Sequence, residues 1–317
     1  MSQERVQVRQ LEYFVALAQE RNFARAAAAC FVSQPALSEA IRKLEHELGV
    51  LLVRRGNAFE GLTSEGERVI VWARRILADH DALRQEIMAM HSGLSGTLRL
   101  GVIAEATTTA QLLIEPFVVA HPLTRVRMET RLPTREILSK ISQFELDAGI
   151  VHIDSDDVPP GFEVVPLYRE KYVLIASRSL VPNYETEISW AEAAELPMCM
   201  FSGAMFSRRI INDALEAHNV HFTPQIETDS MASIYSLALT GRWASIVPHP
   251  WMHAFAHRLD LRTLIVCDPI VSTGVALVTL SGHPGGIMAN ALNDIARQLT
   301  LEVRFAQLLP GNDLLSV

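Results

Sequence analysis

The feature that most constrains this chain is a helical pattern with an abrupt start and end, between residues 33 and 49. Ser33 is a good N-cap, and Pro35 falls in the first turn, where its missing N–H breaks no bond. Gly49 suits the left-handed position that follows a helix. Between these bounds apolar residues recur at steps of three and four, at Leu37, Ile41, Leu44 and Leu48. The pattern predicts a helix that buries one stripe and presents a polar face on the other side.

Two shorter helical patterns come before this helix. The first carries apolar residues at Leu11, Phe14, Val15 and Ala18. The second, residues 22–30, is rich in alanine, so another helix can approach it closely. A turn over residues 31–33 joins it to the capped helix, and this arrangement is typical of a DNA-binding helix-turn-helix. The segment that follows, residues 53–63, holds arginines, glycines and an asparagine and predicts a small two-stranded wing.

These segments resemble the N-terminal domain of LysR-type transcriptional regulators. The resemblance rests on FARAAAACFVSQPALSEAIRKLEHELGVLLVRR followed by LTSEGE, and it continues more weakly along nearly the whole chain. It implies that the polar helix face enters the major groove of promoter DNA. The DNA-binding residues predicted on this basis are Ser33, Gln34, Pro35, Ser38, Arg42, Arg54, Arg55 and Asn57. Glu39 stands where the family usually has a basic or amide side chain, so the bases that are read stay open.

Charge is divided unevenly along the chain. The net charge is −8, yet residues 1–92 hold 12 basic and 12 acidic residues. The acidic excess therefore lies in the C-terminal part, away from the DNA. No apolar run approaches the ~20 residues that span a bilayer, and the N-terminus lacks the apolar stretch of a secretion signal. With three cysteines far apart in sequence, Cys30, Cys199 and Cys267, we expect a cytoplasmic protein without membrane contact.

A single long helix is predicted over residues 64–92. Thr63 suits its N-cap, and Glu65 and Glu67 lie in the first turns, where the helix dipole favours anions. Its apolar residues alternate steps of four and three around one histidine, at Val69, Ala73, Ile76, His80, Leu83, Ile87 and Met90. This heptad pattern predicts pairing with a second chain. The resemblance implies an antiparallel dimer of this helix, and tetramers through the C-terminal domains.

Strand and helix patterns alternate after a hinge at residues 91–96. Alternation of this kind predicts α/β units with a largely parallel sheet. The resemblance implies a periplasmic-binding-protein-like α/β effector domain over residues 93–310, behind a winged helix-turn-helix domain (1–63) and a long linker helix (64–92). Its first subdomain would hold about 97–155 and 274–306, and its second about 156–273.

A small-molecule effector is expected between the two subdomains, beyond the carboxyl ends of the strands. The loop after the first strand, IAEATTT, offers free N–H groups and hydroxyls that suit an anion, whereas Glu105 would repel one. Either Glu105 points to solvent, or the effector is cationic or richly hydroxylated. Thr134 is the expected N-cap of the next helix. The predicted effector-binding residues are Ala104, Glu105, Ala106, Thr107, Thr134, Val151, His152, Phe201, Ser202, Gly203 and Pro248.

Other functions fit isolated features. The spacing of four between His249, His253 and His257 leaves a cytoplasmic solute-binding or metal-sensing module as the alternative, although no HExxH motif or nearby cysteine supports a metal site. Peroxide sensors of the family carry two cysteines a few residues apart, whereas Cys199 and Cys267 are distant, so a local dithiol switch is not expected.

An enzyme is not expected either, because the chain lacks a nucleophile elbow, a P-loop and a dinucleotide fingerprint. No cofactor or bound metal is predicted. The expected partners are double-stranded promoter DNA, a small-molecule effector, further copies of the chain, and RNA polymerase.

Overall fold

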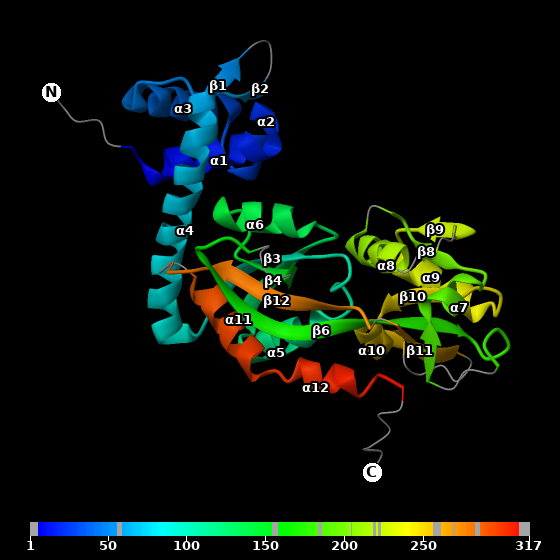
Figure 1. The fold of residues 1–317 in the computed structure, drawn as a ribbon. Coiled ribbons are helices and arrows are strands. Elements are labelled where there is room, and N and C mark those ends of the chain that lie inside the picture. Colours follow the sequence, from blue (N-terminus) through cyan, green and yellow to red (C-terminus); the bar gives the residue numbers. More distant parts are fainter. Residues whose placement is uncertain are drawn as a thin grey trace.

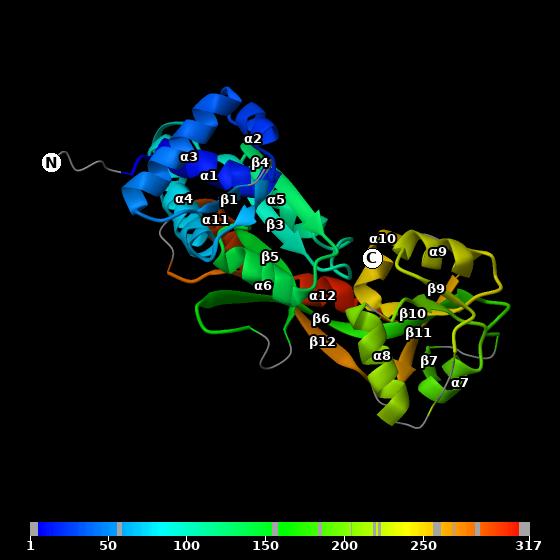
Figure 2. The same ribbon diagram turned by 90° about the horizontal axis from the view of Figure 1, so that it is seen from above.

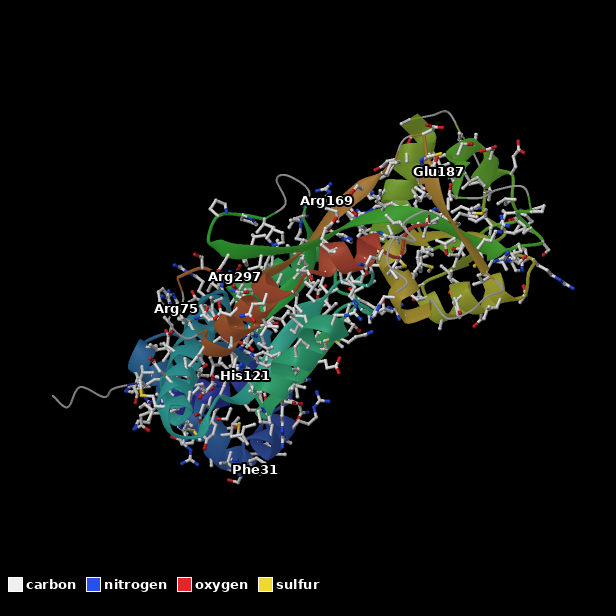
Figure 3. The ribbon with its side chains drawn as sticks, turned by 90° about the horizontal axis from the view of Figure 1, so that it is seen from below. Phe31, Arg75, His121, Arg169, Glu187 and Arg297 are labelled. Atoms are coloured by element: carbon white, nitrogen blue, oxygen red, sulfur yellow. The ribbon has the colours of Figure 1, made fainter. Side chains whose placement is uncertain are left out.

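The computed structural model describes residues 6–55, 59–153, 158–182, 186–203, 205–217, 220, 223–255, 261–268, 270–282 and 286–310. A helical domain lies at the N-terminal end of the long helix α4 (Ser64–Ser92), and two α/β lobes follow beside it, one beyond the other (Figure 1). The lobe next to α4 is called subdomain I, and the far lobe subdomain II. Subdomain II lies farthest from the helical domain in the view from above as well (Figure 2). Phe31 and Glu187 mark the two far ends of the molecule in Figure 3.

The helical domain is a winged helix-turn-helix. Three helices surround its core, and two antiparallel strands form the wing: α1 (Val8–Glu20), α2 (Phe23–Ala29), α3 (Gln34–Leu48), β1 (Val53–Arg55) and β2 (Phe59–Leu62). Ser33 caps α3 by accepting a bond from the N–H of Ala36, and Gly49 ends α3 with φ of 70°. Leu37, Ile41 and Leu44 are fully buried as predicted, whereas Leu48 at the end of the stripe is exposed.

A buried carboxylate joins the recognition helix α3 to the wing. Glu45 is 6% exposed, and its Oε1 accepts bonds from the N–H groups of Leu52 (2.9 Å) and Val53 (3.2 Å). Such charge-assisted bonds are stronger than neutral ones. The side chain therefore sets the position of β1 against α3.

Helix α4 has two faces with different tasks. Thr63 caps it as predicted, accepting from the N–H of Gly66 at 2.9 Å. Ala73 is buried in the core of the helical domain and Val69 packs against that core, so these two residues do not belong to a free seam. The apolar residues that remain exposed on α4 are Trp72, Ile76, Leu83, Ile87, Met88 and Met90.

The effector domain is built on one mixed sheet that continues through both subdomains. Its strand order is β4-β3-β5-β12-β6-β11-β7, with β10 also paired to β6. The strands are β3 (Ser95–Val102), β4 (Leu123–Thr130), β5 (Ala148–Ile153), β6 (Phe162–Ser177), β7 (Glu187–Ser189), β10 (Ser245–Pro248), β11 (Leu261–Cys267) and β12 (Ser272–Leu280). The prediction of a largely parallel sheet is wrong here. Strands β6 and β12 run antiparallel to each other because the chain passes from subdomain I to subdomain II along one and returns along the other.

Helices cover both subdomains and give each a core of its own. Those of subdomain I are α5 (Gln111–Ala120), α6 (Thr134–Ser142), α11 (Ile287–Gln298) and α12 (Leu301–Ala306). Subdomain II contains α7 (Trp190–Ala194), α8 (Phe206–Ala217), α9 (Met231–Leu239), η1 (His249–Trp251) and α10 (Met252–Phe255), with a two-stranded parallel sheet of β8 (Cys199–Phe201) and β9 (Ile226–Thr228). Within the described residues no helix is both long enough and apolar enough to cross a membrane.

Helix α6 approaches the sheet closely because β5 has a glycine beneath it. A Cβ atom at Gly149 would lie 2.2 Å from Ile137, so no larger residue fits without displacing the helix. The N-cap of α6 is Pro133 rather than the predicted Thr134, which is the first residue of the helix. Proline fits there because its extended backbone leads directly into the first turn.

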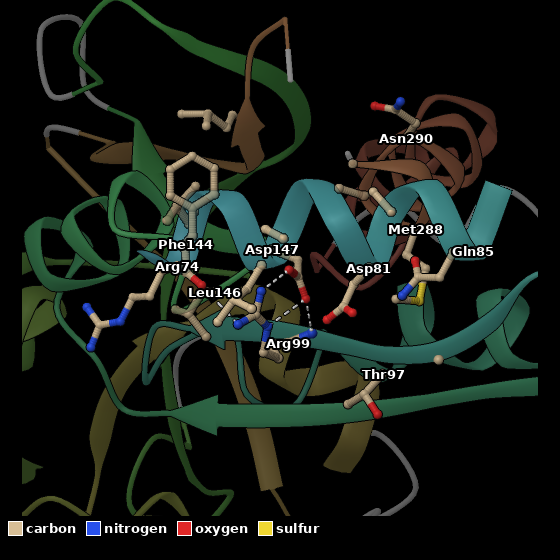
Figure 4. A pocket seen from close by; sticks show the side chains of 18 of the residues that line it. Arg74, Asp81, Gln85, Thr97, Arg99, Phe144, Leu146, Asp147, Met288 and Asn290 are labelled. Carbon is tan, nitrogen blue, oxygen red and sulfur yellow. Dashed lines mark hydrogen bonds and ion pairs between the residues drawn. The ribbon is translucent and has the colours of Figure 1, made fainter. Parts of the chain in front are cut away.

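The inner face of α4 is attached to subdomain I. The guanidinium of Arg74 pairs with Glu145 at 2.6 Å, and beside it Arg99 on β3 binds Asp147 through two nitrogens at 2.5 and 3.1 Å. A pocket of about 510 Å³ lies at this junction, where Asp81 and Gln85 of α4 come close to β3 (Figure 4). Subdomain I and the linker helix therefore form one connected body.

Candidate functional site

The predicted DNA-binding residues gather on the outer face of the helix-turn-helix. Ser33, Gln34 and Pro35 are exposed at the start of α3, and Ser38 is half-buried one turn further on. Arg42 is exposed, and its guanidinium lies 3.1 Å from the carboxylate of Glu39. The structure thus brings a donor-rich surface together at the N-terminal half of α3, the part of a recognition helix that contacts base edges.

The wing supplies the second part of this face. Arg54 is exposed on β1, whereas Asn57 and the side chain of Arg55 lie outside the residues that the structure describes. Phe23 of α2 packs edge-on against Phe59 of β2, with ring centroids 6.3 Å apart, and so fixes the wing to the helices. Sequence reasoning missed Phe31, which is 96% exposed in the turn before α3 and has a φ of 56°.

A cleft of about 1520 Å³ separates subdomain I from subdomain II. Subdomain I contributes the loop after β3 and the start of α6, and subdomain II contributes the loop after β8 and one face of α8. Five of the predicted effector-binding residues line this cleft, namely Ala104, Glu105, Thr134, His152 and Ser202. The cleft therefore lies between the two subdomains, where the sequence analysis expected an effector to bind.

The other predicted effector-binding residues lie elsewhere. Ala106 and Val151 are fully buried in the core of subdomain I, and Phe201 packs edge-on against Trp251 with centroids 5.0 Å apart. The hydroxyl of Thr107 donates to the carbonyl of Ala104 at 2.8 Å. Pro248 is buried on β10 opposite Tyr172, and Gly203 is exposed beside Ser202 without lining the cleft.

Several lining residues were missed by sequence reasoning. Three arginines line the cleft: Arg131 in the segment before α6, Arg135 in the first turn of α6, and Arg209 on α8. The guanidinium of Arg209 lies over the ring of Phe206, 5.6 Å from its centroid, so an aromatic surface and a positive charge occur together. The local runs RLPTRE and FSRR were the available signals, but each reads equally well as a solvated helix start.

Acidic side chains also line the cleft, and their positions matter. Asp213 and Glu216 lie two and three turns along α8 from its start, whereas the three arginines are at or near the helix starts. Asp229 forms an ion pair with Arg131 across the mouth of the cleft. The cleft lining therefore carries both positive and negative side chains.

Glu105 does not point to solvent, so the first of the two expectations for it is wrong. It is 3% exposed, and its Oε1 accepts a bond from the backbone N–H of Ser207, in the first turn of α8, at 3.1 Å. Its backbone carbonyl accepts from the indole N–H of Trp251 at 2.8 Å. A residue of subdomain I is thus held by two elements of subdomain II.

His152 forms the floor of the cleft together with a buried carboxyl group. Its ring stacks on Phe206, with centroids 4.0 Å apart and planes inclined by 22°, and its Nε2 lies 3.6 Å from Glu170. Burial raises the pKa of the Glu170 carboxyl, His152 acts against this rise, and the charge of Glu105 adds to it. A buried polar cluster therefore lies where the chain crosses between the subdomains, and the pKa of Glu170 in this cluster depends on the charges of its neighbours.

Two of the three histidines in the metal-sensing alternative, His249 and His253, pack against other parts of the protein. His249 is 2% exposed, and its Nδ1 accepts a bond from the N–H of Lys171 at 2.9 Å. His253 packs near Phe305, with ring centroids 6.3 Å apart, and His257 lies outside the described residues. No group of three or more ligand-type side chains suited to a metal ion occurs in the described parts of the chain.

The cysteines are poorly placed for redox chemistry. Cys199 is fully buried on β8, and Cys30 and Cys267 lie half-buried in the helix-turn-helix and on β11. Burial raises the pKa of all three thiols, which keeps them in the unreactive protonated form.

Two family models match the chain over the parts just described. The bacterial regulatory helix-turn-helix protein model of the LysR family matches residues 8–67, and the LysR substrate binding domain model matches residues 91–300. The chain therefore belongs to the LysR family of transcriptional regulators. This confirms the resemblance, the fold class and the functional class predicted from the sequence, and it disfavours a solute-binding or metal-sensing module without DNA binding.

The named relatives are transcriptional regulators and not enzymes. The hydrogen peroxide-inducible genes activator of Haemophilus influenzae is 26% identical over 310 residues, which cover 94% of this chain and 97% of the relative. The DNA-binding transcriptional dual regulator OxyR of Escherichia coli K12 is 33% identical over 199 residues, 62% of this chain and 61% of OxyR.

Solved structures share the fold across nearly the whole chain. A full-length OxyR variant from Pseudomonas aeruginosa has a TM-score of 0.74 at 24% identity and covers 95% of this chain and 97% of its own. Full-length CbnR complexed with its target DNA has a TM-score of 0.62 at 21% identity, with 92% and 99% covered. The winged domain, the linker helix and the two-lobed effector domain are thus a common arrangement.

The stability of this protein should depend on pH through His249. Burial lowers the pKa of His249 to about 4, from 6.5 in the unfolded chain. Between these values the unfolded state binds more protons, so stability falls as the pH drops, by about 3 kcal/mol in all. We expect His249→Asn, whose amide oxygen can still accept the Lys171 N–H, to reduce this loss by about that amount.

Urea unfolding at pH 7 and pH 4 measures the effect. His46→Asn, at an exposed position on α3, is the control and should keep the wild-type slope. A wild-type slope in His249→Asn would show that another group causes the loss.

Proposed function

We propose that this chain is a LysR-family regulator that reads promoter DNA with the outer face of α3 and the wing, and that a small molecule in the cleft between the subdomains controls it. One observation carries the proposal: the exposed polar face of α3 and the large cleft between the subdomains occur in one chain, and one rigidly packed part of the protein connects them. That part consists of α4 and subdomain I, joined through the Arg74–Glu145 ion pair. Since the target is chromosomal DNA, the protein would work in the cytoplasm.

The DNA contacts follow from exposure and chemistry. Gln34, Ser38 and Arg42 present hydrogen-bonding groups of the kind that read base edges in the major groove. Arg54 would contact the phosphates, as would Asn57 and Arg55 if the wing follows the family arrangement. The Arg42–Glu39 pair gives Arg42 a preset direction, and a carboxylate at that position can accept from a cytosine amino group.

A dimer through the outer face of α4 accounts for an otherwise unexplained apolar stripe. Trp72, Ile76, Leu83 and Ile87 are 61%, 43%, 58% and 53% exposed, at steps of four, seven and four. Apolar residues that repeat with this period along an exposed helix pair with another helix. We infer an antiparallel pair of α4 helices and tetramers through the effector domains, and we keep RNA polymerase as a proposed partner. For the domain boundaries we propose residues 63 and 92, with the crossing into subdomain II within β6.

The effector is proposed to have an anionic group and an apolar or aromatic part. Arg135 and Arg209 would bind the anionic group, and the ring of Phe206 and the side chain of Met205 would contact the rest. Relatives named as hydrogen peroxide-inducible activators raise peroxide as a second signal. The buried Cys199 thiol with its raised pKa does not favour oxidation, so we propose ligand binding rather than a thiol switch.

Substitution of Arg42 by alanine should distinguish base reading from phosphate binding. We expect Arg42→Ala to cost about 1–3 kcal/mol on the operator and to relax specificity at one position. Arg54→Ala should weaken binding to all sequences alike and reduce the salt slope by about one. Gel shifts with DNA from upstream of its own gene, at several salt concentrations, measure both. Equal sequence-independent losses in the two variants would remove Arg42 from the reading face.

The linker stripe is tested by Leu83→Asp. A carboxylate at this position would be buried without a partner in the dimer, which costs several kcal/mol, so the chain should dissociate at micromolar concentration. Arg84→Asp is the control, because it changes the charge by two units, more than Leu83→Asp does, at an exposed position outside the stripe. It should leave the mass in solution unchanged. Analytical ultracentrifugation gives the mass. A native mass for Leu83→Asp would show that the stripe is not an interface.

The cleft is tested by a thermal-shift screen of small carboxylates and other metabolites on the full chain. A ligand found in this way should bind at least tenfold more weakly to the double variant Arg135→Ala/Arg209→Ala, because two charges that bind its anionic group are removed. A tenfold loss of affinity corresponds to about 1.4 kcal/mol of binding free energy. Arg127→Ala, on the exposed face of β4, removes the same charge outside the cleft and should leave the affinity unchanged. Equal affinities in all three proteins, measured by calorimetry, would place the ligand elsewhere.

A further inference from the structure

Several contacts tie subdomain II to subdomain I across the effector cleft, and most of them involve the start of α8 or η1. Glu105 binds the N–H of Ser207 at 3.1 Å, and Trp251 donates to the Glu105 carbonyl at 2.8 Å. His152 stacks on Phe206 at 4.0 Å. Arg131 and Asp229 close the mouth of the cleft with an exposed ion pair. The described form of the domain is thus held together from within.

The Glu105 contact differs from the others in its chemistry. The first N–H groups of a helix have no acceptor inside that helix, and the helix dipole adds a partial positive charge there. A buried carboxylate on such an N–H makes a charge-assisted bond, stronger than a neutral one and stronger still away from water. At 3% exposure, Glu105 is well shielded from solvent. By comparison, exposed pairs such as Arg131–Asp229 contribute little.

An ordinary helix cap would come from the residue just before the helix. Here the carboxylate is 102 residues away in sequence and belongs to the other subdomain. It also lines the cleft where an effector is proposed to bind. Ser207 itself is fully buried, and its hydroxyl has no hydrogen-bond partner among the described residues, so a second donor lies unused beside the amide. Local helix capping therefore does not account for the arrangement.

We propose that Glu105 is an intramolecular latch of the effector cleft: its carboxylate holds subdomain II against subdomain I while the cleft is empty, and an effector's anionic group releases it by taking over the N–H of Ser207. The inference rests on the proposed function of the cleft. The latch also explains how a cleft that contains the Glu105 carboxylate can accept an anion. Glu105 and the effector compete for the same donor, the N–H of Ser207, so the two negative groups do not occupy adjacent positions at the same time.

The consequence of release follows from the attachments of the two subdomains. Subdomain I is fixed to α4 by the Arg74–Glu145 pair, while the described part of subdomain II lies on the far side of subdomain I from α4 (Figure 1). Once Glu105 leaves Ser207, only the bond from Trp251, the stacking of His152 on Phe206 and the exposed Arg131–Asp229 pair remain of these contacts, so subdomain II rotates more easily about the strands β6 and β12. The latch therefore sets the resting geometry of the whole effector domain.

Hydrogen exchange of the full-length protein tests the latch at the amide concerned. Because Ser207 donates to Glu105 and lies in the first turn of α8, the protection of its N–H depends on the latch. We expect Glu105→Ala to exchange this amide at least tenfold faster. Acetate at 100 mM should restore most of the protection, since it can fill the vacated carboxylate position, while 100 mM chloride should not.

Two further variants make the result specific. Glu105→Gln keeps an oxygen acceptor but loses the charge, so its Ser207 amide should exchange about threefold faster and acetate should have no effect, because the amide side chain fills the position. Glu115→Ala removes an exposed glutamate of α5 in the same subdomain and should exchange like the wild type. If Glu105→Ala fails to fold, Glu105→Gln alone decides the matter through the same exchange measurement.

The outcome that overturns the latch is unchanged protection of Ser207 in Glu105→Ala and Glu105→Gln, or equal effects of acetate and chloride. DNA binding separates this failure from a failure of the proposed function. Glu105→Ala should change the length of the footprint on operator DNA, because the latch sets the geometry of the effector domain. A wild-type protein that does not bind operator DNA contradicts the proposed function and leaves the exchange result valid.

Discussion

The strand β6 is the constraint on which the rest of the effector domain depends. Its first part, residues 162–171, pairs with β12 in subdomain I with one bulge, and its last six residues pair with β10 and β11 in subdomain II. Because one continuous strand belongs to both lobes, the lobes cannot slide past each other or separate. They can only bend and twist about the crossing, and small changes at the cleft become rotations of a whole lobe.

Rotation of one lobe can be transmitted to the DNA-binding domain only if the other lobe is attached to the linker helix. Subdomain I is anchored by the packing of α4 against β3 and by the partly buried pairs Arg74–Glu145 and Arg99–Asp147. In the proposed mechanism the cleft lies between an anchored lobe and a lobe that rotates, and the buried polar cluster around His152 and Glu170 would lie at the pivot. A ligand in the cleft would contact both lobes and would therefore bind open and closed forms with different affinity, which is the requirement for control.

Local features of the sequence predicted local structure well. Ser33, Gly49 and Thr63 were identified as helix ends because caps involve residues three or four positions apart. The helix-turn-helix and the α/β character of the second half followed from apolar periodicity and from the family resemblance. The exposed polar face of α3 was also evident, because a helix stripe fixes which side chains point outward.

Long-range features could not be predicted in the same way. The direction of β12 depends on where the chain returns between the lobes, and no residue pattern encodes this. Glu45 and Glu105 look like ordinary charged residues until their partners appear, 7 and 102 positions away. The cleft arginines Arg131, Arg135 and Arg209 were missed because a basic residue at a helix start gives no sign of facing a second lobe.

The division of α4 into two faces has a consequence for how a signal would spread. Its inner face belongs to its own chain, and its outer apolar face, in the proposed dimer, belongs to the partner. A helix that is packed on both sides cannot rotate about its axis without disturbing both neighbours, because its side chains interdigitate with those of each neighbour. In such a dimer, a rotation of α4 driven by the effector domain of one protomer would move the winged domains of both protomers. Binding of one effector molecule would therefore change the contacts at both half-sites of the DNA.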